Sequence, residues 1–244
     1  MEDVNNEAIE IKKQKLDHRM QILVTVSVIS VLVIMTGVTT VVIVFNVDME
    51  REMGVDDPVQ IDDEMTEVPT FKFIDRSEWG ARDPVSRTNL DTPVQYVIVH
   101  HTAMNRCYTM EECKAQMRAI QNFHMDVRKW NDIGYNFCVG DDGNVYEGRG
   151  WDTVGAHATW YNNYSIGICV MGDFTDTLPS DAAMKTVQSL IKYCVENNKV
   201  IDDYILYGHR QVRREGTTCP GDTFFDRVKT WPHWVPGQHF PPTK

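Results

Sequence analysis

The sequence has little of several features that would point to a function at once. No internal repeat is present, which argues against solenoid and propeller architectures. No stripe of basic residues is present either, and acids outnumber bases by 35 to 24, for a net charge of −11. Because nucleic-acid-binding domains carry basic patches, we expect no nucleic-acid partner.

Charge is entirely missing from residues 22–45. At 1.5 Å of rise per residue, a helix of this length exceeds the roughly 30 Å thickness of the hydrocarbon core of a bilayer. A cleavable signal peptide is the alternative, but its apolar core usually has only about 7 to 15 residues and a small-residue cleavage site follows it. The segment therefore predicts a transmembrane signal-anchor helix.

The basic residues near this segment predict its orientation. Lys12, Lys13, Lys15 and Arg19 precede it, whereas Arg51 is the nearest base after it. Since basic residues favour the cytoplasmic side, residues 1–21 are expected to form a cytoplasmic tail. We expect a single-pass type II protein of the plasma membrane, with its C-terminal domain extracellular.

The acidity of the chain is concentrated next to the predicted span. Residues 46–67 hold nine acids and one base, which accounts for −8 of the net charge of −11. Residues 46–70 are poor in apolar side chains, and we interpret them as an acidic extracellular stalk. The net charge therefore says nothing about the ligand of the folded part.

Cysteine is missing from the first 106 residues, and all six cysteines lie on the side predicted to be oxidising. Cys107 and Cys113 enclose a loop short enough to be bridged. Cys219 would be withheld from disulfide chemistry if it binds a metal. The three remaining cysteines are an odd number, so at least one thiol stays unpaired within the chain. Their pairing is open: Cys138, Cys169 and Cys194.

The rest of the sequence alternates strand and helix patterns. Expected strands span residues 95–101, 135–139, 144–147, 165–171 and 204–208. Expected helices span residues 109–128, 180–197 and 224–231, with Thr109 and Ser180 as caps. This alternation predicts one α/β domain, residues 71–240, with a mixed central sheet flanked by helices and preceded by one transmembrane helix.

The stretch from His209 to Cys219 offers an imidazole and a thiol, which are two ligands of a possible zinc site. A hydrolytic zinc site needs three protein ligands and an open position for water. His100 or His101 could supply the third ligand, but side chains alternate along a strand, so only one of them can face a shared site. By spacing alone, two further histidines remain candidates: His124 and His157.

Eight motifs follow one another in order, at residues 97–103, 121–125, 132–137, 143–151, 155–158, 165–168, 207–210 and 230–234. In sequence and in order they resemble motifs of the animal peptidoglycan recognition proteins, which are related to phage and bacterial zinc N-acetylmuramoyl-L-alanine amidases. The resemblance covers residues 71–234.

This resemblance implies a role for individual residues. His100, His209 and Cys219 match the zinc ligands of the family. Family members with serine in place of this cysteine generally lack amidase activity and serve as receptors. Tyr135 matches the groove tyrosine that assists catalysis, and Thr217 matches the threonine two residues before the cysteine.

The same family resemblance implies a disulfide and a substrate groove. Cys107 and Cys113 match a short-range disulfide of the family. The resemblance implies that four residues line the groove that would hold the muropeptide: His124, Trp130, Trp151 and His157. For the two tryptophans, packing in the core is the alternative.

The implied function is hydrolysis of the amide between N-acetylmuramic acid and L-alanine of bacterial peptidoglycan, with Zn²⁺ as cofactor, in innate immunity. A second hypothesis, suggested by the anchor, is a weakly catalytic or non-catalytic membrane receptor that senses peptidoglycan, signals, and assembles with itself or with other recognition proteins. A plain adhesion domain would leave the metal-ligating set unexplained.

Three positions depart from the pattern of the family. The segment between His209 and Cys219 is longer than usual, with residues 213–216 as the insertion. Lys129 stands where members that bind diaminopimelate tend to have glycine, and Tyr164 where they often have arginine. The preference for one stem peptide therefore stays open. Asn163 begins a glycosylation sequon.

Overall fold

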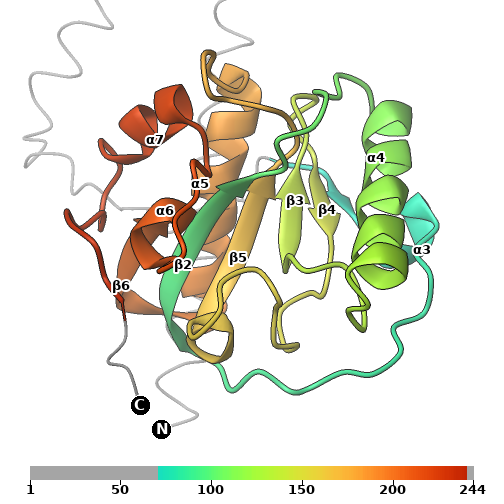
Figure 1. The fold of residues 1–244 in the computed structure, drawn as a ribbon, viewed down its shortest axis with the longest axis horizontal. Helices are drawn as coiled ribbons and strands as arrows, with labels where there is room; N and C mark the ends of the chain where they lie inside the picture. The colour runs from blue at the N-terminus through green and yellow to red at the C-terminus, as the bar shows by residue number, and fades with distance from the viewer. Residues whose placement is uncertain (1–70, 241–244) are drawn as a thin grey trace, which may run out of the picture. The chain divides into compact units, whose positions relative to one another are not determined.

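The computed structural model describes residues 71–240 (Figure 1). The predicted cytoplasmic tail, transmembrane helix and acidic stalk, residues 1–70, lie outside the described residues. Within residues 71–240, no helix is long and apolar enough to cross a membrane. The anchor and its orientation therefore stay predictions.

A mixed sheet of six strands forms the centre of the domain, as the sequence predicts (Figure 1). The strands lie in the order β1-β4-β3-β5-β2-β6. The β3 and β4 strands pair antiparallel as the expected hairpin, and the other neighbours pair parallel. The strands are β1 (Phe73–Ile74), β2 (Val94–His101), β3 (Phe137–Val139), β4 (Val145–Glu147), β5 (Ser165–Val170) and β6 (Val200–Gly208).

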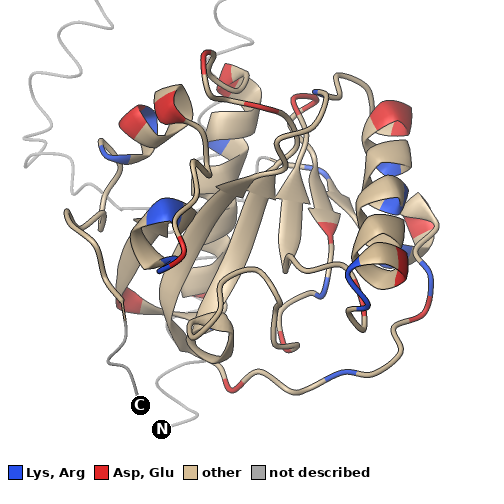
Figure 2. Cartoon of the chain, viewed as in Figure 1, with Lys and Arg blue, Asp and Glu red and all other residues tan. Residues whose placement is uncertain are grey.

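Helices cover both faces of this sheet. The helical elements are α3 (Arg76–Trp79), α4 (Met110–Asn122), the π-helix η1 (Phe123–Val127), the 3-10 helix η2 (Asn162–Tyr164), α5 (Asp181–Glu196), α6 (His209–Val212) and α7 (Asp222–Val228). Charged side chains colour the outer surfaces of α4 and α7, whereas β2, β3 and β5 are drawn without charge (Figure 2). The central strands are therefore buried on both faces.

The alternation of side chains along the strands divides the core. Val97 and Val99 of β2 belong to the cluster that contains the apolar stripe of α5. Cys138 and Cys169 belong to the cluster that contains the buried residues of α4. Since His100 pairs in register with Cys169, its side chain emerges on the α4 face of the sheet.

The expected caps are confirmed. Thr109 accepts a hydrogen bond from the backbone of Glu112, and Glu112 accepts one from the backbone of Thr109, which closes the predicted capping box. Ser180 accepts a hydrogen bond from the backbone of Ala183 at the start of α5. The helix predicted over residues 109–128 does not continue as an α-helix to its end, because its last turn widens into η1.

The last helix differs in its bounds from the predicted residues 224–231. It begins earlier, at Asp222, directly after Gly221, whose φ of 97° is open to glycine without steric cost. It ends at Val228. Trp231 follows the helix as a buried core residue.

Two disulfides join described residues. Cys107 and Cys113 are bridged, with an S–S distance of 2.04 Å, as the resemblance implies. Cys138 and Cys169 form the second bridge between neighbouring strands. Cys194 is a buried free thiol within the apolar stripe of α5. Of the three cysteines whose pairing the sequence left open, the two on strands are therefore bridged and Cys194 is free.

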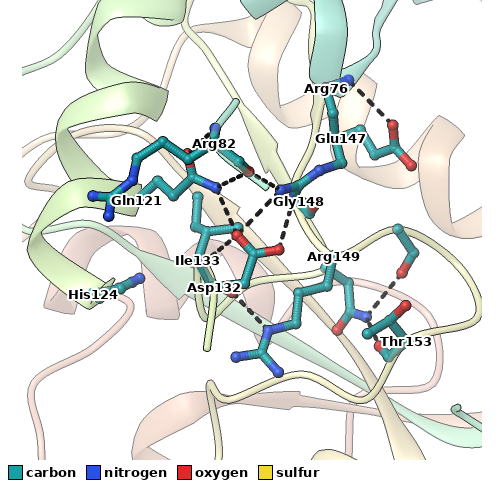
Figure 3. Close-up of polar contacts among 12 residues, drawn as sticks. Arg76, Arg82, Gln121, His124, Asp132, Ile133, Glu147, Gly148, Arg149 and Thr153 are labelled. Carbon is teal, nitrogen blue, oxygen red and sulfur yellow. Dashed lines mark hydrogen bonds and ion pairs between the residues drawn. The ribbon is translucent and has the colours of Figure 1, made fainter. Parts of the chain in front are cut away.

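A buried ion pair fixes the segment that follows η1 (Figure 3). Asp132 lies 3.0 Å from a guanidinium nitrogen of Arg76 and accepts hydrogen bonds from the side chain of Gln121 and the backbone of Ile133. Gln121 also donates to the carbonyl of Arg82. One carboxylate thus connects α3, α4 and the segment that begins at residue 132.

Replacing Asp132 by alanine should destabilise the protein by roughly 3 to 5 kcal/mol, because the largely buried guanidinium of Arg76 would lose its only carboxylate partner among the described residues. Asp126→Ala is the matched control. It removes the pair with Arg82, whose side chains are 46% and 56% exposed, and should cost less than about 1 kcal/mol. Urea denaturation followed by tryptophan fluorescence measures both values. Equal losses in the two variants would contradict this account of the network.

Candidate metal centre and groove

Three potential metal ligands converge at one edge of the sheet. His100 is near the end of β2, and His209 begins α6 directly after the neighbouring parallel strand β6. Cys219 precedes α7. One ligand atom from each of the three residues lies within 4.8 Å of the others, and all three residues are buried. The structure therefore brings together the three metal ligands expected from the sequence.

The two adjacent histidines of β2 face opposite sides, as alternation along the strand requires. His100 directs Nδ1 to Cys219, with 3.7 Å between Nδ1 and Sγ. His101 instead accepts a hydrogen bond from the backbone of Phe174 at 3.3 Å. Spacing alone left either histidine as the third candidate ligand. The structure places His100, and not His101, with its ring directed to Cys219.

The sulfur of Cys219 has a donor that suits a thiolate. The backbone N–H of His101 donates to Sγ at 3.3 Å. The carbonyl of Cys219 accepts a hydrogen bond from the backbone of Arg210, which closes the segment between the two ligands. The longer loop at residues 213–216 therefore leaves Cys219 beside the histidines.

Thr217 lies next to this centre but contacts the backbone. Its hydroxyl accepts a hydrogen bond from the N–H of Cys219 at 3.2 Å. Its side chain is half-buried, and it is not among the described residues that line the adjacent pocket. A role for Thr217 in steadying an oxyanion stays a prediction.

Burial sets the protonation states of these three side chains. It lowers the pKa of His209 to about 4 and that of His100 well below its usual range. It raises the pKa of the Cys219 thiol to about 12. Both imidazoles are therefore neutral at physiological pH, whereas the thiol would release its proton on binding a metal.

This donor set fits zinc. Two neutral imidazoles and one sulfur are ligands that Zn²⁺ prefers, and three protein ligands leave one position for water. The buried backbone donor to sulfur further favours a thiolate. The residues present are therefore suited to a catalytic type of zinc site.

A pocket of about 1010 Å³ adjoins the proposed metal centre. His100 and His209 line it, together with Tyr135. Three of the four expected groove residues also line it: His124, Trp130 and His157.

Trp151 lies elsewhere, against the α5 side of the core. Its ring stacks on Phe73, with centroids 6.1 Å apart, and packs against Phe137 at 4.1 Å and Tyr193 at 5.3 Å. The groove position expected for Trp151 is therefore wrong, because its apolar ring is part of the core packing.

The pocket residues that were not expected from the sequence include four with large side chains: Met104, Phe123, Arg128 and Trp160. All of them come from loops or from the π-helical turn. Trp160 has a φ of 78°, which is uncommon for a bulky residue. The glycine-rich pattern before it indicated a groove loop without showing which side chain would face the groove. The inserted loop contributes further lining residues: Arg213, Arg214 and Glu215.

His124 is held by the segment that the buried ion pair positions (Figure 3). Its Nδ1 accepts a hydrogen bond from the backbone of Gly134 at 2.9 Å. A side chain at Gly134 would meet the ring of Trp130 and the carbonyl of Ala156 at 2.8 Å, so the close approach requires glycine. Burial, followed by the charges of nearby arginines, lowers the pKa of His124 to about 4. The ring is neutral, with its proton on Nε2.

Tyr135 is a partly buried phenol beside the proposed metal ligands. Its ring lies 5.3 Å from that of His100 and 5.7 Å from that of His124. Burial, and then the charge of a Cys219 thiolate, raise its pKa above the ordinary value. Tyr135 is therefore a protonated hydroxyl, able to donate a hydrogen bond, throughout the physiological range.

Comparison with known proteins shows the family to which the chain belongs. The family profile for N-acetylmuramoyl-L-alanine amidase matches residues 90–222. Peptidoglycan-recognition protein SC2 of Drosophila melanogaster is 45% identical over 162 residues, which cover 66% of this chain and 87% of that protein. N-acetylmuramoyl-L-alanine amidase of Homo sapiens is 44% identical over 164 residues, which cover 66% of this chain and 28% of that protein.

Solved structures agree. Wild-type Drosophila PGRP-LB matches with a TM-score of 0.66 and 42% identity, over 68% of this chain and 97% of that one. The family profile and the fold place the chain in the N-acetylmuramoyl-L-alanine amidase family. Within this family, the chain belongs to the peptidoglycan recognition proteins.

Proposed function

We propose that this protein is a zinc-dependent amidase that binds bacterial peptidoglycan and hydrolyses the bond between N-acetylmuramic acid and L-alanine, in innate immunity. The observation that carries the proposal is the convergence of His100, His209 and Cys219 within 4.8 Å of one another, with the two histidines lining the pocket. A receptor of this family would need the pocket, but it would not need the complete ligand set.

The roles of the residues follow from their chemistry. His100, His209 and Cys219 would hold zinc, which supplies a Lewis acid that polarises the scissile carbonyl and lowers the pKa of a bound water. Tyr135 donates a hydrogen bond to the oxygen on which negative charge develops. Thr217 is proposed to assist Tyr135 in this role.

The pocket has the features of a muropeptide site. Phe123, Trp130 and Trp160 keep much of their rings exposed and offer apolar faces along it. His124 offers a hydrogen-bond donor at Nε2, because Gly134 occupies its other nitrogen. These residues would orient the substrate over the metal.

Solved relatives support this class of ligand. Peptidoglycan recognition protein LE has been determined in complex with tracheal cytotoxin, a monomeric diaminopimelic acid-type peptidoglycan. The ectodomains of the recognition proteins LCa and LCx form a complex to which tracheal cytotoxin is bound. We propose that this chain binds muropeptides in the corresponding groove.

A membrane receptor that senses peptidoglycan and signals is the second candidate. It is favoured by the predicted span at residues 22–45 and by the ectodomain complex of LCa and LCx. Such a receptor would bind muropeptides and assemble with itself or with other recognition proteins. Binding without hydrolysis separates this candidate from the amidase.

Purified protein incubated with peptidoglycan should release stem peptides with a free L-alanine amino terminus, detected by mass spectrometry. A chelator should stop the release, and Cys219→Ser should abolish it because the metal loses its sulfur ligand. Tyr135→Phe should retain zinc and lower kcat by about 10² to 10³ with little change in KM. Tyr108→Phe, at an exposed tyrosine away from the pocket, is the matched control.

Release that is insensitive to the chelator, or that is unchanged in the Cys219→Ser variant, would refute the zinc mechanism. Muropeptide binding with no hydrolysis by the unaltered protein would leave the receptor.

The membrane arrangement is a further proposal. We propose a single-pass type II protein of the plasma membrane, with residues 71–240 outside the cell. Protease added to intact cells should digest this domain, and Asn163, which is exposed in η2, offers a glycosylation site there. Digestion only after the membrane is opened would reverse the proposed orientation.

A further inference from the structure

His157 has two ring nitrogens in unusual surroundings. Its Nδ1 lies 3.0 Å from Nε2 of the proposed metal ligand His100. Its Nε2 is buried and has no hydrogen-bond partner, the only such side-chain atom among the described residues. A buried polar atom without a partner is unfavourable, so its retention calls for a reason.

The surrounding backbone is shaped to admit this ring. A side chain at Gly167 of β5 would meet ring atoms of His157 at 2.3 to 2.5 Å, and one at Gly155 would meet them at 2.4 Å. Glycine in the interior of a strand weakens that strand, and here it gives the ring its place. The backbone N–H groups of His157 and Ala158 both donate to the side chain of Asn162 at 2.9 Å, which fixes the loop.

If His100 binds a metal, the hydrogen bond between the two histidines can have only one donor. The Nδ1 atom of His100 faces Cys219, so this atom must be free of a proton to bind a metal. The proton of His100 then lies on Nε2 and is donated to Nδ1 of His157. The proton of His157 must in turn lie on its own Nε2, which is the atom without a partner. The reverse arrangement would protonate the ligand atom of His100 and block it.

We propose that His157 is a positioning residue of the metal centre, whose Nδ1 accepts the proton of His100 Nε2 and so fixes the tautomer and orientation of the ligand. This inference rests on the proposed zinc site. It assigns His157 a role besides contact with the substrate in the groove, and it explains why a buried donor is left without a partner. Such outer partners typically change metal affinity by about 10- to 100-fold.

Zinc affinity of the full-length protein, measured by competition with a chromophoric chelator and without peptidoglycan, tests the role. His157→Leu removes the acceptor and should weaken zinc binding by about 10- to 100-fold. His157→Asn places an amide oxygen near the position of Nδ1 and should recover most of the affinity. His124→Asn is the matched control, since His124 lines the same pocket without contacting a proposed ligand, and it should leave zinc affinity unchanged.

The tautomer itself is observable by histidine-selective nitrogen NMR of the unaltered protein with zinc bound. We expect His157 to carry a proton on Nε2 and none on Nδ1. The opposite tautomer overturns the inference, and so does zinc affinity that is unchanged in His157→Leu.

The outcomes separate this inference from the proposed function. Peptidoglycan hydrolysis with zinc affinity independent of His157 would sustain the amidase and refute the positioning role. Zinc affinity that depends on His157 in a protein without hydrolysis would do the reverse. Absence of zinc binding in the unaltered protein would overturn both.

Discussion

The parallel pairing of β2 with β6 is the constraint on which the site depends. The two strands run side by side in the same direction, with Val99 opposite Gly208. The residue that follows each of these two is a proposed metal ligand, His100 in β2 and His209 at the start of α6, so the register alone places both at one edge. Functional residues of α/β sheets commonly gather where parallel strands end. A shift of one residue in this register would turn His100 to the opposite face of the sheet.

Around this edge, local interactions and burial prepare the ligands for a metal. The loop between His209 and Cys219 closes through the hydrogen bond from Arg210 to the carbonyl of Cys219. Burial favours neutral imidazoles, as metal binding requires, but it also favours a protonated thiol. The two effects oppose each other, and a metal that replaces the proton of Cys219 would remove the conflict.

Much of the fold and of the ligand set could be predicted from the sequence because the signals are local. The capping box of Thr109 and Glu112 defines the start of α4, and the alternation of side chains along β2 allows only one of His100 and His101 to face the site. The family resemblance supplied what spacing could not, namely which histidine accompanies His209 and Cys219.

What the sequence could not predict depends on long-range packing. Cys138 and Cys169 are 31 residues apart in sequence and become neighbours only because β3 pairs with β5. Trp151 follows a glycine-rich loop, yet its ring packs in the core against Phe137. The π-helical turn that brings Phe123 to the pocket has no local sequence signal, since a uniform α-helix fits the same apolar spacing.

The central claim, that two histidines and one cysteine form a single zinc site with an open position, is tested most directly by replacing zinc with Co²⁺ in the full-length protein. We expect about one equivalent to bind and to give the intense visible absorption of four-coordinate cobalt with a thiolate charge-transfer band. The thiolate band should disappear in Cys219→Ser. A weak six-coordinate spectrum, or one with no thiolate band in the unaltered protein, would contradict this claim.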